Sequence, residues 1–85
     1  MSKAIRFLKI GATYKVVKSF IDYDKLNHEI GETWTFDKLT YVAYHDGVCL
    51  HVIQNNEPNM YRFMDIKEEQ QPIIENFLDF VEEIK

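Results

Sequence analysis

The sequence predicts an α+β fold, in which a small, strongly bent antiparallel β-sheet or SH3-like barrel is capped by a C-terminal amphipathic α-helix. Three observations support this fold. Residues 4–65 alternate β-branched and aromatic side chains with polar ones, and short turn sequences separate these runs. The apolar spacing then changes to a helical period over about residues 69–84. The chain has 85 residues, enough for one domain (1–85) with one core.

The N-terminal third predicts a turn, a strand and a polar loop. Residues 4–10 form a short apolar stretch that we expect to be a strand or a turn. Gly11 predicts a turn before the first strong strand, which spans residues 13–21. Within this strand, Lys18 indicates either a snorkelling side chain or a bend. Residues 22–31 are polar and predict a loop.

The middle of the chain predicts short strands joined by tight turns, as in an antiparallel meander or a small barrel. The clearest hairpin signal is Asp46-Gly47, because an Asp-Gly pair readily adopts the positive φ angles of a tight turn. A further turn is expected at residues 55–59. The expected strands of this part span residues 32–36, 39–44, 48–54 and 60–64.

The final segment predicts an amphipathic helix. Pro72 suits the first helical turn, where its missing N–H removes no internal hydrogen bond, so the helix is expected to begin near residues 69–71. A helix of this length is too short to be stable alone and must pack on the sheet. Its apolar face would consist of Ile73, Ile74, Phe77, Leu78, Val81 and Ile84.

Composition and charge narrow the classes of function. The net charge is -4, and the basic residues are spread along the chain, so direct nucleic-acid binding is disfavoured. The single Cys49 rules out an internal disulfide and fits a reducing cytoplasm. The first residues do not resemble a signal peptide, and the apolar runs are too short to span a membrane. We therefore expect a cytoplasmic protein without membrane contact.

The stretch from Phe20 to Phe36 contains the densest set of chemically useful side chains. Its acidic residues and His28 could converge on a metal, but no recognised metal-binding spacing is present, and turn hydrogen bonds explain them better. No metal and no cofactor are therefore expected. A second pair, Cys49 and His51, would share one face of a strand, yet nothing nearby would lower the pKa of the thiol. We expect this pair to be inert and the protein not to be an enzyme.

Aromatic side chains favour a recognition surface. Tyrosine and tryptophan beside carboxylates are well suited to hold a peptide or a flat ligand, although the same side chains can simply cover the edge of a small core. The candidate binding face consists of Tyr23, Asp24, His28, Glu32, Trp34, Tyr44 and His45.

One pattern covers much of the N-terminal half and resembles a known family. It reads L-x-x-G-x-x-Y-x-V-x-x-x-F-x-D-Y-D-x-x-x-H-x-x-G-E-x-W-x-F from Leu8, and the resemblance continues into the C-terminal third. The chain resembles a small bacterial family known as domain of unknown function 3601. In that family glycine is usual where this chain has Lys25. The resemblance implies the domain boundary, and it implies no activity, cofactor or catalytic residue.

These observations favour a non-catalytic binding module whose partner is a protein, for example an inhibitor, an immunity-type protein or a regulatory subunit. The alternative is a protein that binds a small molecule or nucleotide in a surface groove or between subunits. A homo-oligomer is compatible with either function.

Overall fold

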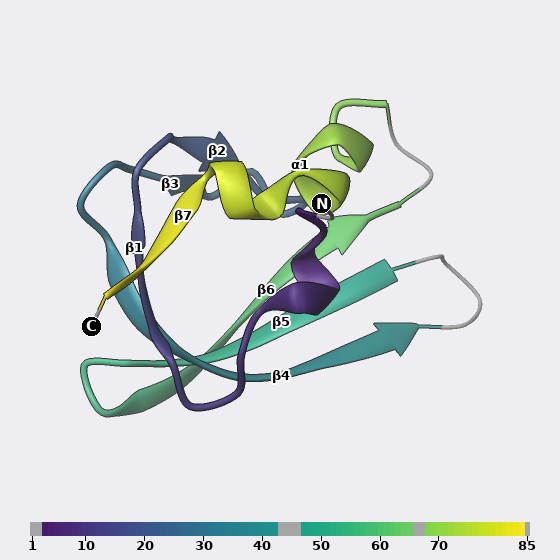
Figure 1. Cartoon of the computed structure of the whole chain (residues 1–85). Helices are drawn as coiled ribbons and strands as arrows, with labels where there is room; N and C mark the ends of the chain where they lie inside the picture. Colours follow the sequence, from purple (N-terminus) through teal and green to yellow (C-terminus); the bar gives the residue numbers. More distant parts are fainter. Residues whose placement is uncertain (1–2, 43–46, 66–67, 85) are drawn as a thin grey trace.

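The structure, a computed structural model, describes residues 3–42, 47–65 and 68–84, and it is mainly β (Figure 1). A five-stranded antiparallel sheet has the order β6-β5-β4-β1-β7, and β2 and β3 form a separate two-stranded ribbon. The strands are β1 (Thr13–Val16), β2 (Phe20–Ile21), β3 (Asn27–His28), β4 (Thr33–Val42), β5 (Gly47–Gln54), β6 (Glu57–Met64) and β7 (Val81–Ile84). The helical elements are α1 (Gln71–Glu75) and the 3₁₀ turns η1 (Ile5–Phe7) and η2 (Phe77–Asp79).

The predicted antiparallel sheet is confirmed, whereas the alternative prediction of an SH3-like barrel is wrong. Among the described residues, β6 and β7 are the outer strands of the large sheet and do not pair with each other, so the sheet stays open. No helix in these segments is long and apolar enough to cross a membrane.

The centre of the sheet is a meander of three long strands. The expected break between the strands at 32–36 and 39–44 is instead an irregularity inside the continuous strand β4, where the register with β5 shifts between Phe36 and Lys38. The turn between β5 and β6 is tighter than expected. Asn55 and Asn56 have φ angles of 54° and 65°, as a two-residue hairpin requires. The expected turn at Asp46 lies outside the described residues.

The prediction of a long C-terminal helix is wrong, although the predicted start of the helix is correct. The helix α1 begins at Gln71, with a proline in its first turn, and ends after five residues. The chain continues through η2 and then pairs as β7 with β1, with Val81 opposite Val16 and Ile84 opposite Thr13. Strand β7 pairs with the flank of β1 that would otherwise be an edge of the main sheet, and it places Val81 in the core.

The first strand is interrupted at the position that Lys18 indicated. The backbone N–H groups of Val17 and Lys18 both donate to the carbonyl oxygen of Phe80, at 2.8 and 3.2 Å, which ends β1. The ammonium of Lys18 lies 4.8 Å from the centre of the Phe80 ring. The bend turns the chain into the ribbon β2–β3 and brings it over the main sheet.

The core lies between the main sheet and the layer formed by η1, the ribbon and the C-terminal segment (Figure 1). Aromatic rings dominate its centre, where Phe77 contacts Phe20 and Phe63 edge-on at centroid distances of 5.3 and 5.9 Å. Trp34 lies in the same cluster and is 2% exposed. This layer therefore places residues 20–32 over the main sheet, on the side of the aromatic core.

Candidate functional site

The turn between β2 and β3 is organised by the carboxylate of Asp22. Its Oδ1 accepts hydrogen bonds from the backbone N–H groups of Asp24 and Leu26, at 2.9 and 3.1 Å. A carboxylate that accepts hydrogen bonds from N–H groups two and four residues later stabilises a tight turn locally. Within this turn Lys25 has a φ of 69°, a left-handed conformation that glycine would adopt without steric cost. We call residues 22–26 the Asp22 turn.

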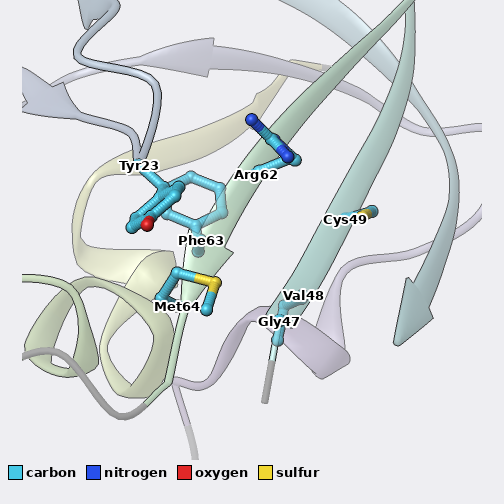
Figure 2. Close-up of a pocket in the computed structure, with 7 residues that line it drawn as sticks. All are labelled: Tyr23, Gly47, Val48, Cys49, Arg62, Phe63 and Met64. Atoms are coloured by element: carbon cyan, nitrogen blue, oxygen red, sulfur yellow. The ribbon is translucent and has the colours of Figure 1, made fainter. Parts of the chain in front are cut away.

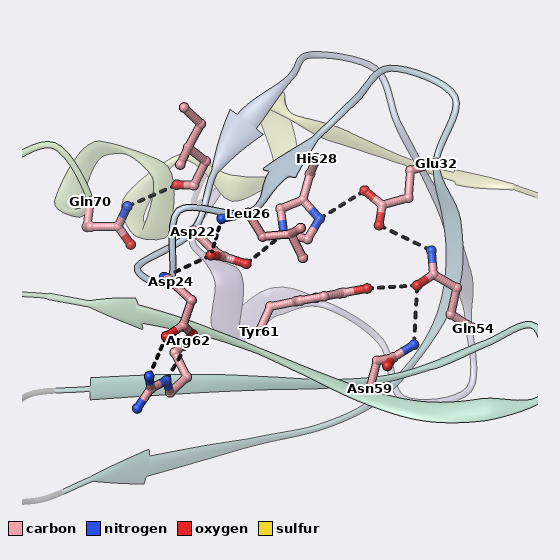
Figure 3. A network of polar contacts seen from close by, with 11 residues as sticks. Asp22, Asp24, Leu26, His28, Glu32, Gln54, Asn59, Tyr61, Arg62 and Gln70 are labelled. Atoms are coloured by element: carbon pink, nitrogen blue, oxygen red, sulfur yellow. Dashed lines mark hydrogen bonds and ion pairs between the residues drawn. The ribbon is translucent and has the colours of Figure 1, made fainter.

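The second carboxylate oxygen of Asp22 belongs to a buried cluster of polar side chains around His28 (Figure 3). The Nε2 of His28 lies 2.9 Å from Asp22 Oδ2, and its Nδ1 lies 2.9 Å from Glu32 Oε2. Ionised carboxylates only accept hydrogen bonds, so an imidazolium that donates from both nitrogens satisfies this arrangement. The cluster then has one positive and two negative charges.

Aromatic rings close the two remaining sides of His28. The ring of Phe20 stacks on the imidazole with centroids 4.6 Å apart, and Tyr61 meets it edge-on at 4.3 Å. The His28 side chain is consequently inaccessible to solvent. Its position is that of a core residue.

A chain of polar contacts connects Glu32 with the end of the β5–β6 hairpin (Figure 3). Glu32 Oε1 accepts a hydrogen bond from Gln54 Nε2 at 3.1 Å, and Gln54 Oε1 accepts one from the Tyr61 hydroxyl at 2.7 Å. Burial raises the pKa of Tyr61 to about 12, and the charges of Glu32 and Asp22 act in the same direction. The network joins the ribbon to the main sheet and keeps Tyr61 protonated.

The burial of several side chains contradicts the predicted binding face. His28 and Trp34 are inside the protein, so the prediction that they belong to an exposed face is wrong. Glu32 is largely turned inward, with a side chain that is 19% exposed. Tyr44 and His45 lie outside the described residues. Of the members of the predicted set that the structure describes, only Tyr23 and Asp24 are exposed.

The cluster is also poorly suited to chemistry. Both imidazole nitrogens are engaged by carboxylates, which leaves neither free to take a proton from a substrate or to bind an ion. No group of three or more His, Cys, Asp or Glu side chains in the described segments has an arrangement that could hold a metal. The cluster therefore functions as a structural link between the ribbon and the sheet.

Exposed residues of the Asp22 turn are fixed to the edge strand β6. The backbone N–H of Tyr23 donates to the carbonyl oxygen of Arg62 at 2.8 Å. The Arg62 guanidinium makes a two-pronged contact with the Asp24 carboxylate, through Nε at 3.0 Å and through Nη2. It also lies 5.9 Å from the Tyr23 ring centre. Arg62 lowers the pKa of Asp24, chiefly through the hydrogen bond.

A pocket of about 240 Å³ opens beside this contact (Figure 2). The Tyr23 ring and Met64 line the side nearest the Asp22 turn, and strands β5 and β6 supply the rest. We call it the β6 pocket, and it is lined by Tyr23, Gly47, Val48, Cys49, Arg62, Phe63 and Met64. Sequence reasoning missed this pocket, because its residues come from three separate segments.

Cys49 and His51 do not act together. The His51 Nε2 lies 2.9 Å from the Thr40 hydroxyl oxygen, on the neighbouring strand. Cys49 is buried and faces Thr40 and Arg62 across the sheet. No hydrogen bond joins Cys49 to His51 in the described part of the chain, so the geometry offers no thiol–imidazole pair.

The fold and this site together define a small, mainly β domain that presents a preformed pocket beside a fixed turn. Comparison with known proteins places the chain more narrowly. It matches the family described as domain of unknown function (DUF3601) over residues 3–84, and it belongs to that family. The predicted membership of this family is thus confirmed.

A solved structure supports the fold. The chain resembles an integron cassette protein from the mobile metagenome of Vibrio cholerae, with 30% sequence identity and a TM-score of 0.86. The alignment covers 91% of this chain and 88% of that protein. No curated protein matches the sequence.

Proposed function

We propose that this chain is a non-catalytic module that binds a protein partner, and that the β6 pocket receives a side chain of that partner. The observation that carries this proposal is the pocket itself, placed beside the exposed Tyr23 and the edge strand β6. A partner can contact such a place with side chains and with its backbone at the same time.

The size of the β6 pocket favours a side chain over a free ligand. Sites for small molecules usually enclose about 300–1,000 Å³, whereas this pocket has about 240 Å³. Tyrosine, arginine, methionine and phenylalanine, which line it, are the residue types enriched at protein interfaces. An anchor residue of a partner would bury aromatic and aliphatic surface here.

Preorganisation also supports the proposal. Tyr23 is held by a backbone hydrogen bond and by the guanidinium of Arg62, which Asp24 fixes in turn. A side chain that is already ordered loses little conformational entropy when a partner binds. The pocket wall would therefore need no rearrangement on binding.

The non-catalytic part of the proposal is supported by the site chemistry. Both nitrogens of His28 are paired, and His51 is bonded to Thr40. We further propose a cytoplasmic location, which the buried, unpaired thiol of Cys49 supports.

Affinity capture from lysate of the source cell tests the proposal, with the wild-type chain and two variants as bait. Tyr23→Ala removes the pocket wall, and Tyr41→Ala is the matched control, because Tyr41 is 65% exposed and lies outside the β6 pocket. We expect a protein that is retained by wild type and by Tyr41→Ala and lost with Tyr23→Ala. Circular dichroism must show all three baits folded. Equal capture by folded Tyr23→Ala would refute the proposal.

A further inference from the structure

We propose that a second hollow, between the Asp22 turn and the start of α1, binds a small zwitterion, namely a free α-amino acid with an apolar side chain. This Gln70 groove has a volume of about 430 Å³ and includes Phe20, Lys25, Glu69, Gln70 and Ile73 in its lining. It is distinct from the β6 pocket, since the two have no lining residue in common.

The first observation is an unpaired polar group. The Gln70 side chain donates from Nε2 to the carbonyl oxygen of Ile21 at 2.9 Å, which fixes the orientation of the amide (Figure 3). Among the residues that the structure describes, its Oε1 has no hydrogen-bond partner, and Gln70 is only 4% exposed. Buried acceptors are normally satisfied, so an orphan acceptor in the wall of a hollow indicates a missing N–H donor. Oε1 itself is shielded from solvent, so a ligand N–H reaches it only when the side chains that cover it move aside.

The second observation is a pair of opposite charges at that rim. Lys25 and Glu69 both line the groove and both are exposed. Neither forms an ion pair with another residue in the described segments, including each other. A ligand that carries an ammonium and a carboxylate can pair with both and also donate to Gln70.

The lining also narrows the ligand class. Phe20 is buried at the base, and the half-buried Ile73 offers further apolar surface for an aliphatic side chain. A phosphate would meet a single lysine here, beside Glu69 and Asp22, so the groove is unsuited to a nucleotide. The volume falls within the range of small-molecule sites. These features favour a molecule such as leucine.

Binding of L-leucine to the full chain tests the proposal by nuclear magnetic resonance of ¹⁵N-labelled protein. We expect saturable shifts of the Gln70 side-chain amide signals and of the backbone amides of Lys25 and Ile73. Leucinamide lacks the carboxylate and mimics the N-terminus of a peptide, whereas 4-methylpentanoate lacks the ammonium. Each should bind about tenfold or more weakly, because each loses a charge-assisted hydrogen bond. Equal binding of leucinamide would assign the groove to peptide N-termini and overturn the proposal.

Variants separate ligand binding from folding. Lys25→Gly removes the ammonium and suits the left-handed backbone, so it should stay folded and bind leucine about tenfold or more weakly. Lys15→Gln removes an exposed lysine of β1 and should bind as wild type. Gln70→Leu should abolish leucine binding. If Gln70→Leu fails to fold, the leucine affinity of Lys25→Gly still tests the proposal. Absence of saturable shifts at 10 mM leucine, on the order of 10-fold above a weak Kd of 1 mM, refutes the proposal. Undiminished binding by Lys25→Gly refutes it too.

Discussion

Replacement of His28 by leucine should remove a large part of the free energy of unfolding of this domain. Leucine is an apolar substitute that still fills much of the space between Phe20 and Tyr61, so the main loss is electrostatic. The substitution leaves the carboxylates of Asp22 and Glu32 facing a buried apolar group in place of a shared cation. Breaking a buried ion pair in this way typically costs about 3–5 kcal/mol. The total free energy of unfolding of a chain of 85 residues is roughly 4–13 kcal/mol.

Urea denaturation, followed by circular dichroism and by the fluorescence of the buried Trp34, measures this loss. The matched control is His51→Leu, because that half-buried imidazole has one hydrogen bond to Thr40 and no buried carboxylate partner. It should cost less than about 1.5 kcal/mol, the usual net worth of one hydrogen bond. In the triple variant Asp22→Asn, His28→Leu, Glu32→Gln, part of the loss should be recovered, because no uncompensated charge remains. A loss below about 1 kcal/mol in His28→Leu would refute the structural role of the cluster.

Three further predictions follow from the same contacts. The pKa of Tyr61 is raised to about 12 in the fold, so its contribution to stability is complete below about pH 10. It is lost as the pH rises from about 10 to 12, and Tyr61→Phe should abolish that part of the alkaline transition in a pH titration of the urea midpoint. Lys25→Gly should stabilise the domain by about 1 kcal/mol, whereas Lys15→Gly within β1 should destabilise it, as thermal melting can show. Asp24→Asn should leave global stability almost unchanged but accelerate hydrogen exchange of the Tyr23 amide, and an unchanged exchange rate would contradict the role of the Arg62 contact.

Local patterns explain which strands could be predicted from the sequence. The apolar run at residues 48–54 and the proline near the start of α1 depend only on neighbouring residues, and the strand and the helix start that they predict are confirmed. The pairing of β7 with β1 joins Ile84 to Thr13, far apart in the chain, so no local pattern indicates it. Val81 and Ile84 are also three positions apart, which suits a helical stripe, and this spacing misled the helix prediction.

The candidate site shows the same limit. The concentration of Asp22, His28 and Glu32 is visible in the sequence, but acidic residues and histidine are usually exposed, so composition alone predicts a surface. The inward orientation follows from pairing: each charged group satisfies another within the core. Arg62 was missed because its partner Asp24 lies 38 positions away.

The position of β7 has a consequence for biosynthesis. Strand β1 lies between β4 and β7, so one flank of β1 stays bare until residues 81–84 have left the ribosome. A bare strand flank can pair with a neighbouring nascent chain, which makes this interval the most hazardous for aggregation. The domain must therefore complete its sheet after translation of Ile84, and a chain stalled before that residue should be a preferred client of chaperones.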